Sequence, residues 1–139
     1  MSLYVLDTDI LQLFQEGHAV VVSHVGAVAP TELAITVLTV EEQLSGWYTQ
    51  LRKARRPDRL AWAYRRLAAN VRFLSRLNIL DFDEPAIQRY EQLKKLKLQV
   101  RKMDLRIAAT VLERNAILVT RNRQDFVQVP ALTVEDWSR

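Results

Sequence analysis

Short runs of aliphatic residues recur along this chain, and longer segments with helical periodicity separate them. The runs cover residues 3–6, 34–38, 78–80, 117–120 and 132–134. Each run is apolar at most of its positions, which is typical of strands that are buried on both faces of a parallel sheet. Strands that alternate with helices predict an α/β fold, here a three-layer α/β/α sandwich with a central, mainly parallel sheet.

Two consecutive helices are expected between the second and third strands. The first begins at Thr39, and it ends before Pro57, which is interpreted as a stop signal. Asp58 is expected to cap the second helix. The apolar stripe of that helix comprises Leu60, Ala63, Tyr64, Leu67, Val71 and Leu74. We expect the two helices to form a helical arm at about residues 40–76, within a single domain that spans residues 1–139.

Two further helices are expected before the fourth strand. Asp83 is placed to cap a helix over residues 84–97, and a second helix covers residues 104–114. Asn115 suits the left-handed conformation that often ends a helix. Residues 19–28 are rich in valine, and by propensity alone they favour a strand.

The composition excludes several kinds of site. The 139 residues include no cysteine, so disulfides, thiolate metal sites and a cysteine nucleophile are excluded. About half of the residues (49%) are apolar, which is enough for one buried core. The apolar runs are too short to cross a bilayer, and the early charge at Asp7 argues against a signal peptide. We therefore expect a soluble cytoplasmic protein without membrane association.

The formal charge is +4, and the basic residues gather in two stretches. The first contains Arg52, Lys53, Arg55, Arg56, Arg59, Arg65 and Arg66, and the second contains Lys94, Lys95, Lys97, Arg101 and Lys102. Such clusters favour a polyanionic partner, although each is equally consistent with a solvated helix face.

Acidic and amide side chains follow the predicted strands. Asp7 comes directly after the first strand, and Glu42 lies shortly after the second. Asn122 and Asp125 follow the strand that ends at residue 120, and Asp104 opens the helix that leads into that strand. Ligands of parallel α/β sheets bind beyond the carboxyl ends of the strands. We therefore expect acids from distant parts of the chain to converge at one edge of the sheet.

Converging carboxylates repel one another, and a divalent cation resolves that conflict. Mg²⁺ and Mn²⁺ prefer oxygen ligands, and they can activate a water for phosphodiester hydrolysis without a nucleophilic side chain. Each acid also has a structural explanation. Asp7 can cap a helix, Glu42 can complete a capping box with Thr39, and Asp104 can face a helix dipole. The residues by themselves leave both explanations open for each acid.

Four motifs of this sequence, in the same order, resemble those of PIN-domain ribonucleases. They are YVLDTD at residues 4–9, TVEEQLSG at 39–46, MDLRIAA at 103–109 and LVTRNRQDF at 118–126. The closing segment VPALTVEDW at residues 129–137 is similar to the tail of VapC-type toxins. The motifs cover nearly the whole chain. The resemblance implies a PIN fold, and it implies a helix rather than a strand over residues 19–28.

The resemblance also implies an endoribonuclease that depends on Mg²⁺ or Mn²⁺. Asp7, Glu42 and Asp104 match the three central acids of the family, and Glu42 is favoured over Glu41 because of its spacing to Gly46. Thr8 and Thr120 match polar residues that support the site. Asp125 is interpreted as the fourth acid, with Asn122 as a polar contributor. The expected metal ligands are Asp7, Glu42, Asp104 and Asp125.

Basic residues next to these motifs are expected to contact the RNA backbone, with plain solvent exposure as the alternative. They are Arg101, Lys102, Arg121 and Arg123. Many relatives have glycine where this chain has Arg101. The resemblance implies a cognate antitoxin and a homodimer. Two alternatives remain: a non-catalytic PIN-like module that binds RNA or protein, and a DNA-binding regulator, which the basic helices keep open.

Overall fold

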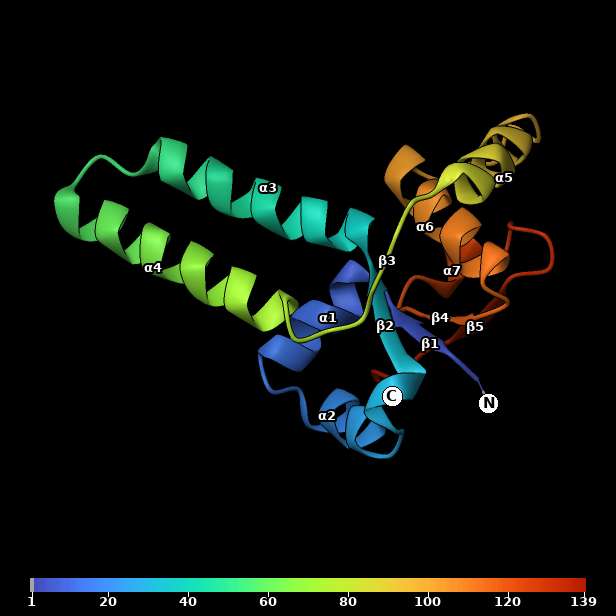
Figure 1. Cartoon of the computed structure of the whole chain (residues 1–139), viewed down its shortest axis with the longest axis horizontal. Helices are drawn as coiled ribbons and strands as arrows, with labels where there is room; N and C mark the ends of the chain where they lie inside the picture. Colours follow the sequence, from blue (N-terminus) through green and yellow to red (C-terminus); the bar gives the residue numbers. More distant parts are fainter. Residues whose placement is uncertain (1) are drawn as a thin grey trace.

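The computed structural model describes residues 2–139 and contains a five-stranded sheet with helices on both faces (Figure 1). The strands are β1 (Tyr4–Leu6), β2 (Leu33–Thr36), β3 (Ile79–Leu80), β4 (Ile117–Val119) and β5 (Thr133–Glu135). Their order in the sheet is β3-β2-β1-β4-β5, and every neighbouring pair is parallel. The first strand of the chain is therefore the central one.

Helices fill the connections between the strands. They are α1 (Thr8–Gln15), α2 (Ala19–Gly26), α3 (Val37–Lys53), α4 (Pro57–Leu74), α5 (Glu84–Lys94), α6 (Lys102–Glu113) and α7 (Arg123–Phe126), with a short 3₁₀ turn at Pro30–Glu32. Within residues 2–139, none of these helices has the length and apolarity needed to cross a membrane.

Two apolar clusters occupy the two faces of the sheet. On one face, Val5 and Leu118 pack with buried residues of α5, α6 and α7. On the other face, Leu6 and Val119 pack with α1, α2 and the end of α4. Because neighbouring residues of a strand point to opposite faces, β1, β2 and β4 each contribute to both clusters. The result confirms the predicted three-layer α/β/α sandwich.

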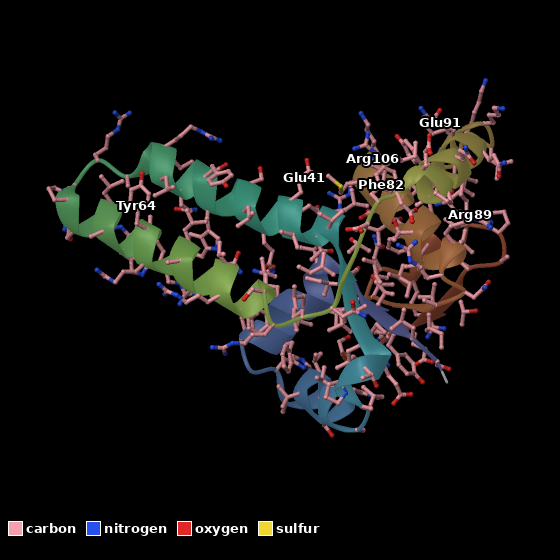
Figure 2. The ribbon with its side chains drawn as sticks, viewed as in Figure 1. Glu41, Tyr64, Phe82, Arg89, Glu91 and Arg106 are labelled. Atoms are coloured by element: carbon pink, nitrogen blue, oxygen red, sulfur yellow. The ribbon has the colours of Figure 1, made fainter. Side chains whose placement is uncertain are left out.

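Helices α3 and α4 form a hairpin that projects away from the sheet, and we call this hairpin the arm (Figure 1). Trp47 of α3 and Trp62 of α4 meet edge to face, with ring centroids 5.6 Å apart. The guanidinium groups of Arg59 and Arg66 lie over these two rings. Tyr64 is exposed on α4, as Figure 2 shows. The tryptophans therefore hold the two helices of the arm together.

The junction between β2 and α3 differs from the prediction. The strand ends at Thr36, and α3 begins at Val37 rather than Thr39. Thr36 caps the helix, because its hydroxyl accepts a hydrogen bond from the Thr39 amide over 3.2 Å. The proposed capping box of Thr39 and Glu42 is therefore wrong. Leu38 is buried in the first turn of the helix, so the apolar run continues across the boundary and does not mark it.

The start of α4 also corrects the prediction. Pro57 begins this helix rather than stopping the previous one, which suits the preference of proline for the first helical turn. Arg56 occupies the N-cap position, so the prediction of Asp58 as the cap is wrong. Asp58 instead forms an exposed ion pair with Arg56 at 2.6 Å.

The buried face of α4 overlaps the predicted apolar stripe only in part. Ala63, Asn70 and Leu74 are the buried residues of this helix. Tyr64 and Val71, which belong to the predicted stripe, are 56% and 48% exposed. Leu60 is 39% exposed as well. The arm leaves the body of the protein, so only part of its apolar surface faces a partner element.

Residues 19–26 form a helix, which confirms the expectation from the family and contradicts strand propensity. His18 caps this helix through Nδ1, which accepts from the Val21 amide over 3.3 Å. His24 stacks on Trp137, with ring centroids 5.2 Å apart. Both histidines have structural contacts. The left-handed Asn115 is confirmed, with a φ of 50°.

The helix after Asp83 is shorter than predicted. Asp83 caps it as expected, because its carboxylate accepts from the Ala86 amide over 3.1 Å. The helix ends at Lys94, three residues before the predicted end at Lys97. Lys97 has a φ of 53°, a left-handed conformation that a helix cannot continue through.

Candidate active site

Asp7 lies between the end of β1 and the start of α1, and it has both roles that its position suggested. One carboxylate oxygen accepts from the Ile10 amide over 3.0 Å, so Asp7 caps α1. The other oxygen accepts a short hydrogen bond from the hydroxyl of Thr120, at the end of β4. The side chain is only 6% exposed. Thr120 therefore holds Asp7 at the carboxyl edge of the central strands.

Burial raises the pKa of Asp7 from 3.8 to about 7. The hydrogen bonds from Thr120 and Ile10 oppose this effect, because they favour the ionised carboxylate. The negative charges of Asp9 and Asp104 add to the rise in pKa. The carboxyl group of Asp7 therefore changes between its protonated and ionised forms near neutral pH, and a nearby cation would favour the ionised form.

Asp104 lies in the first turn of α6 and is 7% exposed. Arg101 donates to both of its carboxylate oxygens, over 3.0 and 3.1 Å. The hydrogen bond to Asp104 raises the pKa of Arg101 above its usual range, and the charges of Glu42 and Asp9 contribute to that rise. The guanidinium group of Arg101 therefore lies within the field of three carboxylates.

Glu42 lies on α3, and its side chain points towards α1. The hydroxyl of Thr8 donates to Glu42 over 2.7 Å. The same hydroxyl lies 3.1 Å from that of Thr39. Its neighbour Glu41 is exposed on α3, as Figure 2 shows. The structure thus connects Glu42, and not Glu41, to the residue that follows Asp7 in the chain.

Asn122 and Asp125 are hydrogen-bonded to each other. The amide nitrogen Nδ2 of Asn122 donates to Asp125 over 2.8 Å. The backbone amide of Asn122 donates to the hydroxyl of Thr120 over 2.9 Å. Because Thr120 in turn donates to Asp7, a hydrogen-bonded chain runs from Asp125 to Asp7. Asp125 thus reaches Asp7 through Asn122 and Thr120.

The four basic residues predicted to bind RNA are all exposed: Arg101, Lys102, Arg121 and Arg123. Arg101 and Lys102 stand at the start of α6, next to Asp104. Arg121 and Arg123 flank Asn122 at the carboxyl end of β4. Positive side chains therefore border the acidic residues on two elements.

The acidic residues suit a hard divalent cation by their chemistry. Within residues 2–139, no three acidic or histidine side chains lie close enough to hold one metal ion between them. Mg²⁺, however, commonly binds through only one or two carboxylates and keeps several of its waters. Asp7 and Asp104, whose charges interact, would offer such a pair of oxygen donors, and a cation bound there would favour the ionised form of Asp7.

A cavity of about 730 Å³ lies beside Glu42, between α1, α3 and α4. Thr8, Glu42 and the buried Asn70 of α4 are among the residues that line it. Asn70 was not among the site residues predicted from the sequence. Its spacing of seven residues from Ala63 and four from Leu74 places it on the buried face of α4, and that spacing was the available signal.

Comparisons with known proteins agree with this fold and these motifs. A model of the PIN domain family matches residues 4–132. The tRNA(fMet)-specific endonuclease VapC of Shigella flexneri is 32% identical over 111 residues, which cover 77% of this chain and 76% of that protein. Ribonuclease VapC2 of Rickettsia felis is 37% identical over 71 residues, which are 48% of this chain and 53% of that relative. The chain thus spans about half the length of the Rickettsia protein.

A solved structure has a similar fold. The DNA-bound VapBC of Salmonella typhimurium has a TM-score of 0.78 and 25% identity, and the match covers 99% of each chain. The overall fold of this chain is therefore similar to that of a solved VapBC structure. Because the family model extends over far more than half of the sequence, the chain belongs to the PIN domain family.

Proposed function

We propose that this protein is an endoribonuclease that hydrolyses RNA phosphodiester bonds with Mg²⁺ or Mn²⁺, and that it is the toxin of a toxin–antitoxin pair. One observation carries the nuclease proposal. Asp7 is buried beside Asp104, at the carboxyl edge of the central strands, and its pKa is raised to about 7. The VapC relatives, which are named ribonucleases and endonucleases, support the same activity.

Each polar residue has a distinct task in this proposal. Asp7 and Asp104 would hold the divalent cation, and Glu42, oriented by the hydroxyl of Thr8, would complete the acidic site. Thr120 fixes the carboxylate of Asp7. A bound Mg²⁺ or Mn²⁺ supplies an activated water and neutralises charge on the reacting phosphate. Asp125 acts on the site through Asn122.

Phosphate binding is assigned to the basic residues around the acids. Arg101 and Lys102 border Asp104, and Arg121 and Arg123 border Asn122. Contacts of this kind supply affinity for the RNA backbone without reading its sequence. They would draw the scissile phosphate towards a group of acids that would otherwise repel it. We infer that the protein acts in the cytoplasm, where its proposed RNA substrate would be found.

The partner proposals follow from the relatives. The Salmonella neighbour was solved as VapBC. We infer a cognate antitoxin for this chain, with a segment that folds over the acidic edge and offers a basic side chain to Asp7 and Asp104. We also infer a homodimer. Co-purification with the product of an adjacent antitoxin-like gene, and the mass of the free protein in solution, test these two inferences.

The nuclease proposal is tested by incubating purified protein with RNA, with and without Mg²⁺ or Mn²⁺. Cleavage is expected only with the metal, and Asp104→Asn should abolish it while the protein stays folded. Glu42→Gln should reduce cleavage by at least about 100-fold, whereas Glu41→Gln, a matched change on an exposed neighbour, should leave it unchanged. Metal-independent cleavage, or full activity of Asp104→Asn, would count decisively against the proposal.

One observation favours a second candidate, a non-catalytic PIN-like module that binds RNA or protein. Arg101 already neutralises Asp104 through two hydrogen bonds, which is how an acidic edge is held without a metal. In that case the wild-type protein would bind RNA without cutting it in Mg²⁺ or Mn²⁺. Removal of the guanidinium in Arg101→Gln would then produce no cleavage either.

A further inference from the structure

The cavity beside Glu42 combines features of a binding site for a small planar group. Its volume, about 730 Å³, is within the range of sites that enclose ligands of nucleotide size. Phe14, Trp47 and Phe73 contribute aromatic surface to its wall. Arg66, whose guanidinium lies 5.6 Å from the Trp47 ring centroid, adds a positive charge.

Asn70 is a buried polar side chain in this wall with an unused acceptor. The residue is 9% exposed, and its Nδ2 donates to the Oε1 of Gln43 over 2.8 Å. Its Oδ1 is shielded from solvent and has no hydrogen-bond partner. A buried carbonyl without a partner costs stability, so Oδ1 of Asn70 is an acceptor that a donor group bound in the cavity would satisfy.

Two glutamines next to Asn70 form a pair that can open. Gln15 and Gln43 exchange hydrogen bonds between their side-chain amides, over 3.2 and 2.9 Å. Both bonds are exposed to solvent, so little is lost when they are replaced by bonds to a ligand. The Oε1 atom of Gln43 accepts from both Gln15 and Asn70, so the two glutamines and Asn70 form one hydrogen-bonded network in the cavity wall.

Gly46 lines the cavity close to Glu42. It lies one helical turn after Glu42, on the same face of α3. A Cβ atom placed on Gly46 would have no neighbour within 4 Å. The space beside Gly46 is therefore free for a ligand, and a large side chain at this position would occupy it.

We propose that this cavity binds one unpaired base of the RNA substrate, and that Asn70 selects bases that carry an exocyclic amino group. The base would stack on the aromatic wall, as bases of single-stranded RNA do, and its amino group would donate to Oδ1 of Asn70. Adenine, guanine and cytosine carry such a donor, whereas uracil has a carbonyl where cytosine has its amino group, so uracil is the base expected to bind most weakly. The inference rests on the proposed ribonuclease function, because Glu42 and Thr8 belong to both sites.

The test is a binding measurement that does not depend on cleavage. Fluorescently labelled single-stranded oligo(A), oligo(C) and oligo(U) of equal length are titrated with the protein at fixed salt in EDTA. We expect oligo(A) and oligo(C) to bind about three- to tenfold more tightly than oligo(U), the contribution of one hydrogen bond. In Asn70→Leu this preference should disappear, while the affinity for oligo(U) stays the same.

Matched variants keep the test informative if Asn70→Leu fails to fold. Gly46→Leu fills the cavity without removing a contact, so it should weaken binding of oligo(A) and oligo(C) to the level of oligo(U). Gly46→Ala should retain the preference, because a methyl group leaves most of the space free. Asn78→Leu makes the same change as Asn70→Leu at an exposed position, and it should also retain the preference.

Two outcomes overturn the inference: equal affinity of the wild-type protein for all three oligonucleotides, or an unchanged preference in both Asn70→Leu and Gly46→Leu. The second is also the result expected if a peptide partner occupies the cavity. Cleavage in Mg²⁺ is measured separately. A base preference without any cleavage would contradict the proposed nuclease activity and leave the base site intact.

Discussion

Arg101 and Asp104, one turn apart at the start of α6, form an ion pair through two hydrogen bonds of 3.0 and 3.1 Å. The carboxylate is buried, and the guanidinium side chain is 71% exposed. The positive charge beside Asp104 thus belongs to the exposed side chain of Arg101, which can rotate away into solvent. Asp104 can therefore exchange Arg101 for another cation without a change in the backbone.

Removal of this competing charge should strengthen binding of the divalent cation. Arg101→Gln is expected to bind Mn²⁺ about three- to tenfold more tightly than the wild type, a modest effect because the arginine is largely exposed. Isothermal titration calorimetry without RNA measures it. Lys102→Gln removes the same charge from the next residue and should leave the affinity for Mn²⁺ nearly unchanged. Unchanged or weaker Mn²⁺ binding by Arg101→Gln would contradict this competition.

The raised pKa of Asp7 should make Asp7→Asn more stable than the wild type at high pH. Because the folded pKa, about 7, exceeds the ordinary value of 3.8, the wild type loses stability as pH rises between these values. The advantage of Asp7→Asn should be near zero at pH 4, grow towards neutral pH, and level off above pH 7 at no more than about 4 kcal/mol. Urea unfolding in EDTA at pH 4, 5.5 and 8 measures it. A difference that does not change with pH would refute the shift.

Thr120→Val keeps the shape of the side chain and removes the hydroxyl that donates to Asp7. We expect it to cost about 1–3 kcal/mol of stability and to raise the pKa of Asp7 further, because that hydrogen bond lowers it. The acid side of the pH–rate profile for RNA cleavage should therefore move to higher pH. Thr110→Val is the control, since Thr110 is also buried but bonds only to the Arg106 carbonyl. A profile that is the same in both variants would exclude this role.

The cap of α3 can be assigned by two substitutions. Thr36→Ala should destabilise the protein by about 1–2 kcal/mol, because it leaves the Thr39 amide without its acceptor. Glu42→Gln should change the unfolding free energy by less than about 0.5 kcal/mol, although it impairs cleavage. Chemical denaturation measures both. If Glu42→Gln were the more destabilising of the two, the capping-box interpretation would be restored.

The sequence was sufficient to predict the layers of the fold, because runs such as residues 117–119 are apolar throughout, as is typical of strands in a sheet covered on both faces. The sequence predicted the ends of the helices and strands less well. Leu38 extends an apolar run into α3, so hydropathy gives no boundary there. The valines of α2 were misleading by propensity, because packing of Val21 into the core outweighs the local preference.

The candidate site was predictable in its acids but not in its contacts. Asp7 was found from its position at a strand end and Asp104 from its position at a helix start, and the charges of the two residues interact in the fold. Sequence spacing does not determine the directions of side chains. It therefore could not predict the hydrogen bond between Asn122 and Asp125 or the one between Arg101 and Asp104. The Oδ1 atom of Asn70 has no hydrogen-bond partner because of the way α1, α3 and α4 pack around it, and no local sequence pattern predicts this.

The central place of β1 in the sheet has a consequence for the protein during its synthesis. This strand leaves the ribosome first, yet it pairs with β4, and Asp7 bonds to a residue 113 positions further along. These contacts have to wait until residue 120 has been translated, since contacts between distant residues form only when both are available. A nascent chain therefore lacks an assembled acidic edge until residue 120 has been translated, and the proposed nuclease stays inert up to that point.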